Sequence, residues 1–179
     1  FDWGLVHVVY IGSEDNPINA YERWDGQPLS PGMRARFAAK YGPDSPQYRW
    51  LEADLRAASA PARRAVVPWI VLITHRPMYH TASHHPMCRP GGDWFACLFR
   101  DTYEPLLLRY KVDMVFSGHS HHYQRSHPMA RDKRVPASGP GSGGGSGSGS
   151  GSGSSHGVVH CIVGTGGYAP TGNAWGTSP

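Results

Sequence analysis

The alternation of hydrophobic and polar positions along the chain predicts short strands separated by helices. Four apolar runs, rich in β-branched residues, have the length of single buried strands. The run at residues 66–73 (VVPWIVLI) is continuous, which predicts a central strand buried on both of its faces. The four predicted strands are residues 5–11, 66–73, 112–116 and 158–163.

Two helices are predicted between these strands. Ser45 has the character of an N-cap with Pro46 at the first helical position, and apolar residues follow at helical spacing to about Ala60. A second helix is predicted over residues 94–110, with Pro105 as a candidate break. Residues 12–42 are polar and rich in turn formers, so we expect their prolines to interrupt any long element.

The order strand, helix, strand predicts a right-handed parallel crossover and therefore an α/β fold. Residues 138–155 consist almost entirely of glycine and serine, which predicts a flexible coil inserted into a single domain of residues 1–179. A natural low-complexity insertion and an engineered linker would have the same composition.

Histidines follow two of the predicted strands directly. The chain holds eleven, and His75 comes after the second strand while His119 and His121 come after the third. Because parallel strands end at the same edge of a sheet, these three imidazoles are expected to converge there. Imidazole suits Zn, Fe, Mn or Cu ions. The three could form a mononuclear site with one open position or part of a larger site, since no carboxylate lies close to them in the sequence.

Charge and hydropathy argue against a nucleic-acid-binding or membrane protein, and the cysteines give two further expectations. The formal net charge is +4, with only small arginine clusters, which favours a solvated surface over a nucleic-acid-binding module. No apolar stretch is long enough to cross a membrane, and the residues at the N-terminus lack the features of a signal peptide. Cys88 and Cys97 could bridge a loop in an oxidising compartment, whereas Cys161 is expected to be a buried free thiol.

Two motifs carry a family resemblance: HRPMY at residues 75–79 and GHSHHYQR at residues 118–125. With the segments QYRWLE, LLLRY and GTGG in the same order, the chain resembles the purple acid phosphatases, a branch of the calcineurin-like metallophosphoesterases. The resemblance implies an incomplete metallophosphoesterase-type α/β sandwich, with sheets flanked by helices and the N-terminal portion of the domain missing. The family's aspartate motifs, its tyrosine ligand and its Asn-His motif have no counterpart here and would precede Phe1.

The resemblance also implies roles for individual residues. His75 and His119 match ligands of a divalent ion (Zn, Mn or Fe(II)), and His121 matches a ligand of Fe(III) in a binuclear centre. His84 and His85 match a pair that binds the substrate phosphate and acts in catalysis. The residues Tyr123, Gln124 and Arg125 would lie just outside the ligands, although Gln124 stands where the family usually has glutamate.

The implied function is acid hydrolysis of phosphate monoesters by a metal-activated hydroxide, with this chain carrying the C-terminal half of the site. The alternative is a catalytically incompetent fragment that acts at most as a histidine metal-binding module. The resemblance further implies a secreted or vacuolar protein that can form a homodimer. The charge pattern and the lack of a long apolar stretch predict no nucleic-acid or membrane partner.

Overall fold

A six-stranded mixed sheet forms the centre of the structure, in the order β1-β2-β3-β4-β8-β5. The computed structural model describes residues 1–14, 30–81, 94–136 and 156–166. The four middle strands are parallel, and the two edge strands run antiparallel to their neighbours. The strands are β1 (Asp2–Trp3), β2 (Val6–Tyr10), β3 (Trp69–Thr74), β4 (Met114–Ser117), β5 (Tyr123–Arg125) and β8 (Val159–Val163).

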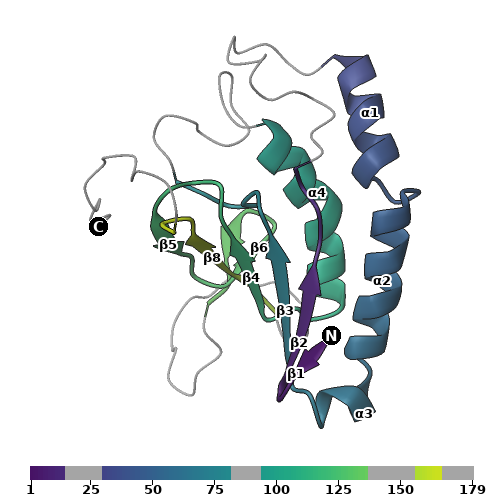
Figure 1. Ribbon diagram of the computed structural model, residues 1–179, viewed down its shortest axis with the longest axis vertical. Coiled ribbons are helices and arrows are strands. Elements are labelled where there is room, and N and C mark those ends of the chain that lie inside the picture. The colour runs from purple at the N-terminus through teal and green to yellow at the C-terminus, as the bar shows by residue number, and fades with distance from the viewer. Residues whose placement is uncertain (15–29, 82–93, 137–155, 167–179) are drawn as a thin grey trace, which may run out of the picture.

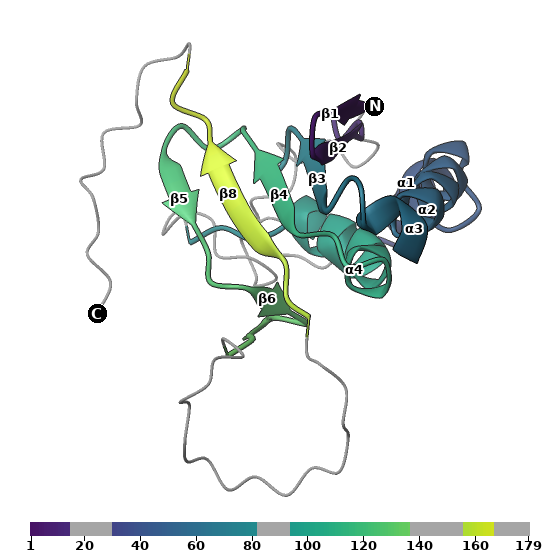
Figure 2. The same ribbon diagram turned by 90° about the horizontal axis from the view of Figure 1, so that it is seen from below.

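The helices pack on one side of this sheet (Figures 1 and 2). They are α1 (Pro31–Tyr41), α2 (Pro46–Ala58), α3 (Pro61–Arg64) and α4 (Trp94–Arg109). Helix α4 lies between β3 and β4 in the chain, and these two strands are parallel neighbours, so the predicted crossover is confirmed. A separate hairpin of β6 (Met129–Ala130) and β7 (Lys133–Arg134) lies beside the sheet.

The two predicted helices are confirmed with small changes at their ends. The Ser45 hydroxyl accepts a hydrogen bond from the backbone N–H of Tyr48, and Pro46 occupies the first turn of α2, as expected of a capped helix start. Helix α4 continues through Pro105 to Arg109 without ending there, so the candidate break is not used.

The sequence pattern predicted no helix within residues 12–42, but α1 forms at the C-terminal end of this segment, beginning at its last proline. Ser30 caps this helix through the backbone N–H of Met33, and Pro31 starts the helix because its missing N–H needs no partner in the first turn. Phe37 and Tyr41 then bury their rings against Phe95 of α4, at centroid distances of 5.6 Å. This aromatic packing involves a distant helix, so a local pattern could not reveal it.

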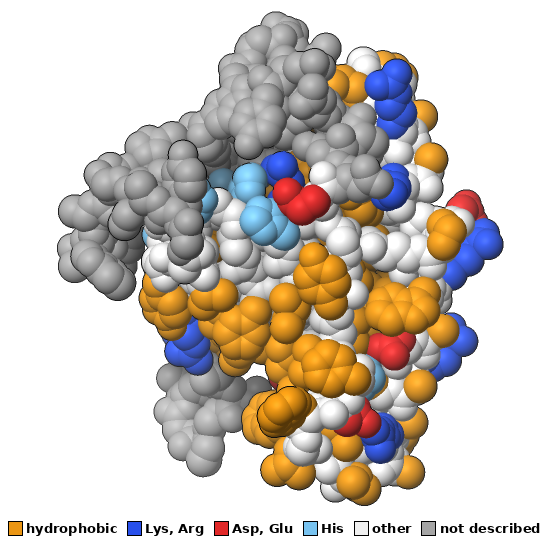
Figure 3. Space-filling model, viewed as in Figure 1, with side chains coloured by type: hydrophobic (Ala, Val, Ile, Leu, Met, Phe, Trp, Pro, Cys, Tyr) orange, Lys and Arg blue, Asp and Glu red, His pale blue; other side chains and the backbone are white. Residues whose placement is uncertain are grey.

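The prediction that β3 is buried on both faces was also wrong. Ile70 and Leu72 are fully buried under the helices, whereas Trp69 and Ile73 on the opposite face are 54% and 37% exposed. Tyr10 pairs with Ile73 and is 60% exposed, so the uncovered face extends across β2 and β3. Figure 3 shows the hydrophobic side chains that gather on this side of the molecule. The reason is that every helix in the described residues lies on the other side of the sheet.

Two further expectations concern membranes and cysteines. Within the described residues, none of the helices has the length and apolar character that a membrane crossing requires. Cys161 is a buried free thiol, as predicted, and burial raises its pKa. Cys97 is disulfide-bonded, and its predicted partner, Cys88, lies outside the described residues.

Candidate metal centre

The carboxyl ends of β3 and β4 bring two of the predicted histidines together. Thr74 and Ser117 are partners in the parallel register, so His75 and Gly118 leave the sheet side by side. The backbone N–H of Gly118 donates to the carbonyl of His75 at 2.9 Å. The side chains meet beyond this bond, with 3.3 Å between Nε2 of His75 and Nδ1 of His119. The predicted convergence of this pair is therefore present in the structure.

His119 adopts an unusual backbone conformation. Its φ angle is +62°, in the left-handed region that few residues other than glycine enter. Histidine is among the residues that tolerate this region best, but the conformation still costs on the order of 1 kcal/mol or more. Strained backbone conformations persist only where the surrounding structure holds the residue, and they are most frequent at functional sites.

A close backbone approach holds the loop that contains His119. The carbonyl oxygen of Ser120 lies so close to Gly164 that a β-carbon at position 164 would be 2.0 Å from it. Only glycine fits at this position, because backbone atoms cannot move aside as a flexible side chain can. The first glycine of the GTGG segment therefore has a steric role at the end of β8, next to the histidine loop.

The third predicted ligand is not grouped with this pair. His121 lies two residues after His119, in the same half-buried loop. Among the parts of the chain that the structure describes, no three His, Cys, Asp or Glu side chains are arranged to hold a metal ion. The three-histidine site stays a prediction.

An arginine that sequence reasoning did not single out lies against the pair. The side chain of Arg76 is only 7% exposed, and its Nη1 is 3.3 Å from Nε2 of His119. Its guanidinium also lies over the ring of Phe95, 5.1 Å from the centroid, and its backbone N–H donates to the hydroxyl of Ser13. The signal was available in the HRPMY motif itself, where Arg76 directly follows the histidine.

A carboxylate also lies beside these side chains, although the sequence indicated none nearby. Glu14 follows the end of β2, the strand beside β3. Its Oε2 lies 3.7 Å from Nε2 of His75 and its Oε1 lies 3.4 Å from Nε of Arg76. Glu14 was missed because it is far from the histidines in sequence, and only the parallel order of the strands brings it near. Figure 3 shows histidine side chains on this face beside acidic and basic ones.

These residues fit part of a metal centre. The 3.3 Å between the facing nitrogens of His75 and His119 suits two ligands of one ion with bonds of about 2 Å. The guanidinium of Arg76 opposes that arrangement, because a fixed positive charge beside His119 repels a cation. The described residues therefore fit two ligands of a centre and do not form a complete one.

The residues predicted to surround the ligands are divided between two faces of β5. The Oε1 atom of Gln124 accepts hydrogen bonds from the backbone N–H and hydroxyl of Thr81 at 3.2 and 3.3 Å. Tyr123 and Arg125 alternate with Gln124 along the strand and therefore lie on its opposite face. The predicted phosphate-binding pair, His84 and His85, lies outside the described residues.

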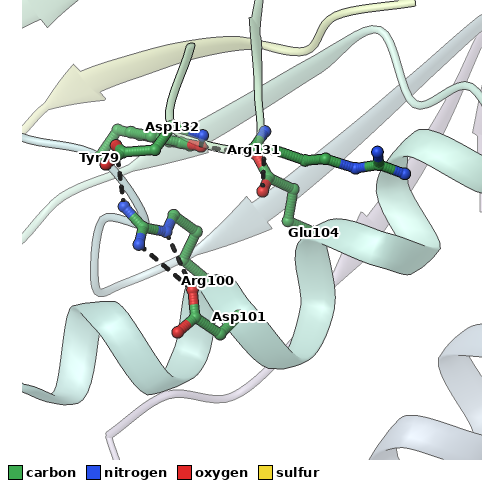
Figure 4. A network of polar contacts seen from close by, with 6 residues as sticks. All are labelled: Tyr79, Arg100, Asp101, Glu104, Arg131 and Asp132. Carbon is green, nitrogen blue, oxygen red and sulfur yellow. Dashed lines mark hydrogen bonds and ion pairs between the residues drawn. The ribbon is translucent and has the colours of Figure 1, made fainter.

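A polar network anchors the segment that carries His75 and Arg76 (Figure 4). The hydroxyl of Tyr79 donates to the buried carboxylate of Glu104 at 2.6 Å and accepts from the backbone N–H of Asp132 at 2.9 Å. Burial and the bond to Glu104 raise the pKa of Tyr79. The guanidinium of Arg100 covers the ring of Tyr79 and pairs with Asp132. The hairpin and α4 thus clamp the end of the loop that begins at His75.

Comparison with known proteins identifies the family. Residues 10–123 match the family model described as calcineurin-like phosphoesterase. The chain belongs to this family. The match includes the ends of β2, β3 and β4, from which Glu14, His75 and His119 extend.

The relatives place the chain near the purple acid phosphatases, as the sequence motifs predicted. It is 30% identical over 153 residues to an acid phosphatase from Aspergillus ficuum, which covers 75% of this chain and 23% of that protein. It is 39% identical over 88 residues to the Fe(3+)-Zn(2+) purple acid phosphatase 12 of Arabidopsis thaliana, covering 49% of this chain and 16% of the relative.

A solved structure confirms the α/β fold. The purple acid phosphatase from yellow lupin seeds superposes with a TM-score of 0.59 at 21% identity, over 98% of this chain and 25% of that chain. The chain therefore corresponds to about a quarter or less of the length of these relatives. It matches a metallophosphoesterase fold of which it covers only a part.

Proposed function

We propose that this chain carries part of the active site of an acid phosphatase that hydrolyses phosphate monoesters. The observation that supports this most directly is the pair of His75 and His119, which meet at the ends of two parallel strands in a phosphoesterase family member. Ligand sites of parallel sheets lie at that edge. The cationic Arg76 beside the pair suits an anionic substrate.

The proposed cofactor is a binuclear centre of Fe(III) with Zn, Mn or Fe(II). One relative is named as an Fe(3+)-Zn(2+) enzyme, which supports such a centre. We assign His75 and His119 to the divalent ion and His121 to the ferric ion, with the remaining ligands from other parts of a longer protein. When bound, such a centre supplies an activated water nucleophile and positive charge for the developing phosphate charge.

The chain's own residues would orient the substrate and exchange protons. We assign His84 and His85 to the phosphate and the leaving group, because an imidazole can donate a proton to a departing oxygen. Gln124 supports the site indirectly, since its side chain holds Thr81 in the loop that leads toward this histidine pair.

Replacing one proposed ligand tests this function. In a longer protein that contains this chain, His119→Ala should lower hydrolysis of p-nitrophenyl phosphate by far more than about tenfold, because the divalent ion loses a ligand. The matched control is His127→Ala, which removes an exposed histidine beyond β5 and should change the rate less than about twofold. A loss below tenfold in the His119 variant would contradict the proposal.

A second proposal concerns residues 1–179 on their own. The described residues hold no group of three metal-ligating side chains, which favours a chain that lacks turnover and binds metal weakly through histidines. Purified 179-residue chain, loaded with Zn²⁺ and Fe³⁺, should therefore show no hydrolysis above a metal-free sample. Measurable turnover would contradict this proposal and leave the parent activity intact.

We further propose that the protein is secreted or vacuolar and forms a homodimer, as the family resemblance implies. A disulfide at Cys97 agrees with an oxidising compartment.

A further inference from the structure

Arg76 presents a buried donor that has no acceptor. The Arg76 side chain is only 7% exposed. Its Nε is inaccessible to solvent and makes no hydrogen bond within the described residues. Leaving a buried N–H unpaired costs on the order of 1–3 kcal/mol, and more for a charged group. Unpaired donors of this kind are rare in folded proteins, so an acceptor from outside the chain is a physical explanation for it.

The nearest anion to this donor is the Glu14 carboxylate, which is poorly placed to satisfy it. Oε1 of Glu14 is 3.4 Å from Nε of Arg76 without the geometry of a hydrogen bond, and Oε2 is 3.7 Å from Nε2 of His75. The two oxygens therefore straddle a guanidinium and an imidazole. The Glu14 side chain is 55% exposed, so it can leave this position without disturbing the core.

We propose that Arg76 forms a binding subsite for a phosphate group, in which the carboxylate of Glu14 occupies the place of the anion until the phosphate displaces it. A guanidinium is suited to this role because its planar donors match two phosphate oxygens. The ring of Phe95 and the bond from the Arg76 backbone to Ser13 hold the arginine in place for that contact. The substrate class rests on the proposed function, but the binding of phosphate itself does not.

The charges of Arg76 and Glu14 favour an anion at this position. A cation there would be attracted by Glu14 and repelled by Arg76. A phosphate would be attracted by Arg76, and it would only have to replace the interaction that Arg76 now makes with the Glu14 carboxylate. Binding that depends on Arg76 should therefore persist without any metal ion. The experiment uses a chelator, so that phosphate carried by a bound metal is excluded.

The test measures binding of inorganic phosphate to the 179-residue chain in the presence of EDTA, followed by the imidazole NMR signals of His75. Glu14→Gln should tighten binding by about three- to tenfold, because the competing carboxylate charge is removed. Arg76→Lys keeps the charge but loses the planar donors. It should weaken phosphate binding by about tenfold relative to the otherwise identical protein that retains Arg76. Circular dichroism confirms that each variant is folded.

A matched control separates a local effect from a change in net charge. Glu52 lies in α2 and pairs with Arg56 of the same helix and with Arg109 of α4, so Glu52→Gln alters the net charge by the same amount as Glu14→Gln. It should change phosphate affinity by less than about twofold. Equal tightening by both variants would overturn the proposal, and so would the absence of saturable binding to the Glu14→Gln chain at millimolar phosphate.

The outcome is distinguishable from failure of the proposed enzyme function. Phosphate binding that depends on Arg76 and Glu14 supports the subsite even if a longer protein shows no hydrolysis. Hydrolysis that is lost on His119→Ala, together with phosphate binding unaffected by Arg76→Lys, supports the enzyme and overturns the subsite.

Discussion

At the scale of single residues, we expect His160 to make the fold sensitive to acid. Its side chain lies in β8 beneath the helices, 4% exposed, with its ring 4.7 Å from that of Tyr79. Neither ring nitrogen has a hydrogen-bond partner within the described residues. Burial lowers the pKa of His160 from 6.5 to about 3, because the charged form would have to leave water.

The direction of the pH effect follows from this lowered pKa. Between about pH 6.5 and 3 the unfolded chain binds a proton at this histidine that the folded chain does not, so stability is lost as the pH falls. From pH 7 to pH 4 we expect this histidine to lower the free energy of unfolding by on the order of 3 kcal/mol. His160→Phe should remove that slope in urea denaturation at pH 7, 5.5 and 4. Parallel pH profiles for the two proteins would show that the imidazole is not responsible.

At the scale of elements, the turn after β8 and the histidine loop depend on each other. A β-carbon at Gly164 would overlap the carbonyl of Ser120, so Gly164→Ala must displace the loop that contains His119. We expect a loss of about 1–3 kcal/mol in the free energy of unfolding, as for other overpacked sites.

The neighbouring Gly166 provides the control for this prediction. A β-carbon there meets no atom within 4 Å, so Gly166→Ala should be nearly neutral. Urea denaturation of both variants measures the difference. The steric account of the GTGG segment fails if Gly164→Ala is as stable as Gly166→Ala.

At the scale of the whole molecule, the helices of the described residues all lie on one side of the mixed sheet and leave its other face uncovered. Parallel sheets occur almost only with both faces covered, and an exposed apolar patch of this kind marks an interface or a tendency to associate. Tyr10 and Trp69 are 60% and 54% exposed on adjacent strands of this face. We therefore expect the isolated 179-residue chain to associate with itself through the sheet.

Sedimentation at increasing protein concentration tests this expectation. The double variant Tyr10→Thr and Trp69→Thr should stay monomeric at concentrations where the wild-type chain associates, since threonine suits a strand without adding apolar surface. The control is Trp50→Thr on α2, where a tryptophan that is 52% exposed lies away from the sheet. Equal loss of association in the control would show that the sheet face has no special role.

The sequence by itself predicted β2, β3, β4 and β8, the helices α2 and α4, and the meeting of His75 and His119. Apolar runs mark buried strands, and the crossover rule brings the ends of parallel strands to one edge, so no distant contact had to be known. The tertiary structure decided what surrounds the pair. Glu14 reaches His75 from a different strand, and Gly164 meets Ser120 from another, because such contacts depend on strand order rather than on local pattern.

The tertiary structure also decided which faces of the elements are covered. The apolar run of β3 reads the same whether helices lie on one face of the sheet or on both, since periodicity describes a strand and not its neighbours. Helix α1 was hidden for a related reason: its stability comes from Phe37 and Tyr41 packing on α4 as well as from its cap. Local pattern therefore determined where the four parallel strands and the helices α2 and α4 lie, and packing between distant segments determined the environment of the site.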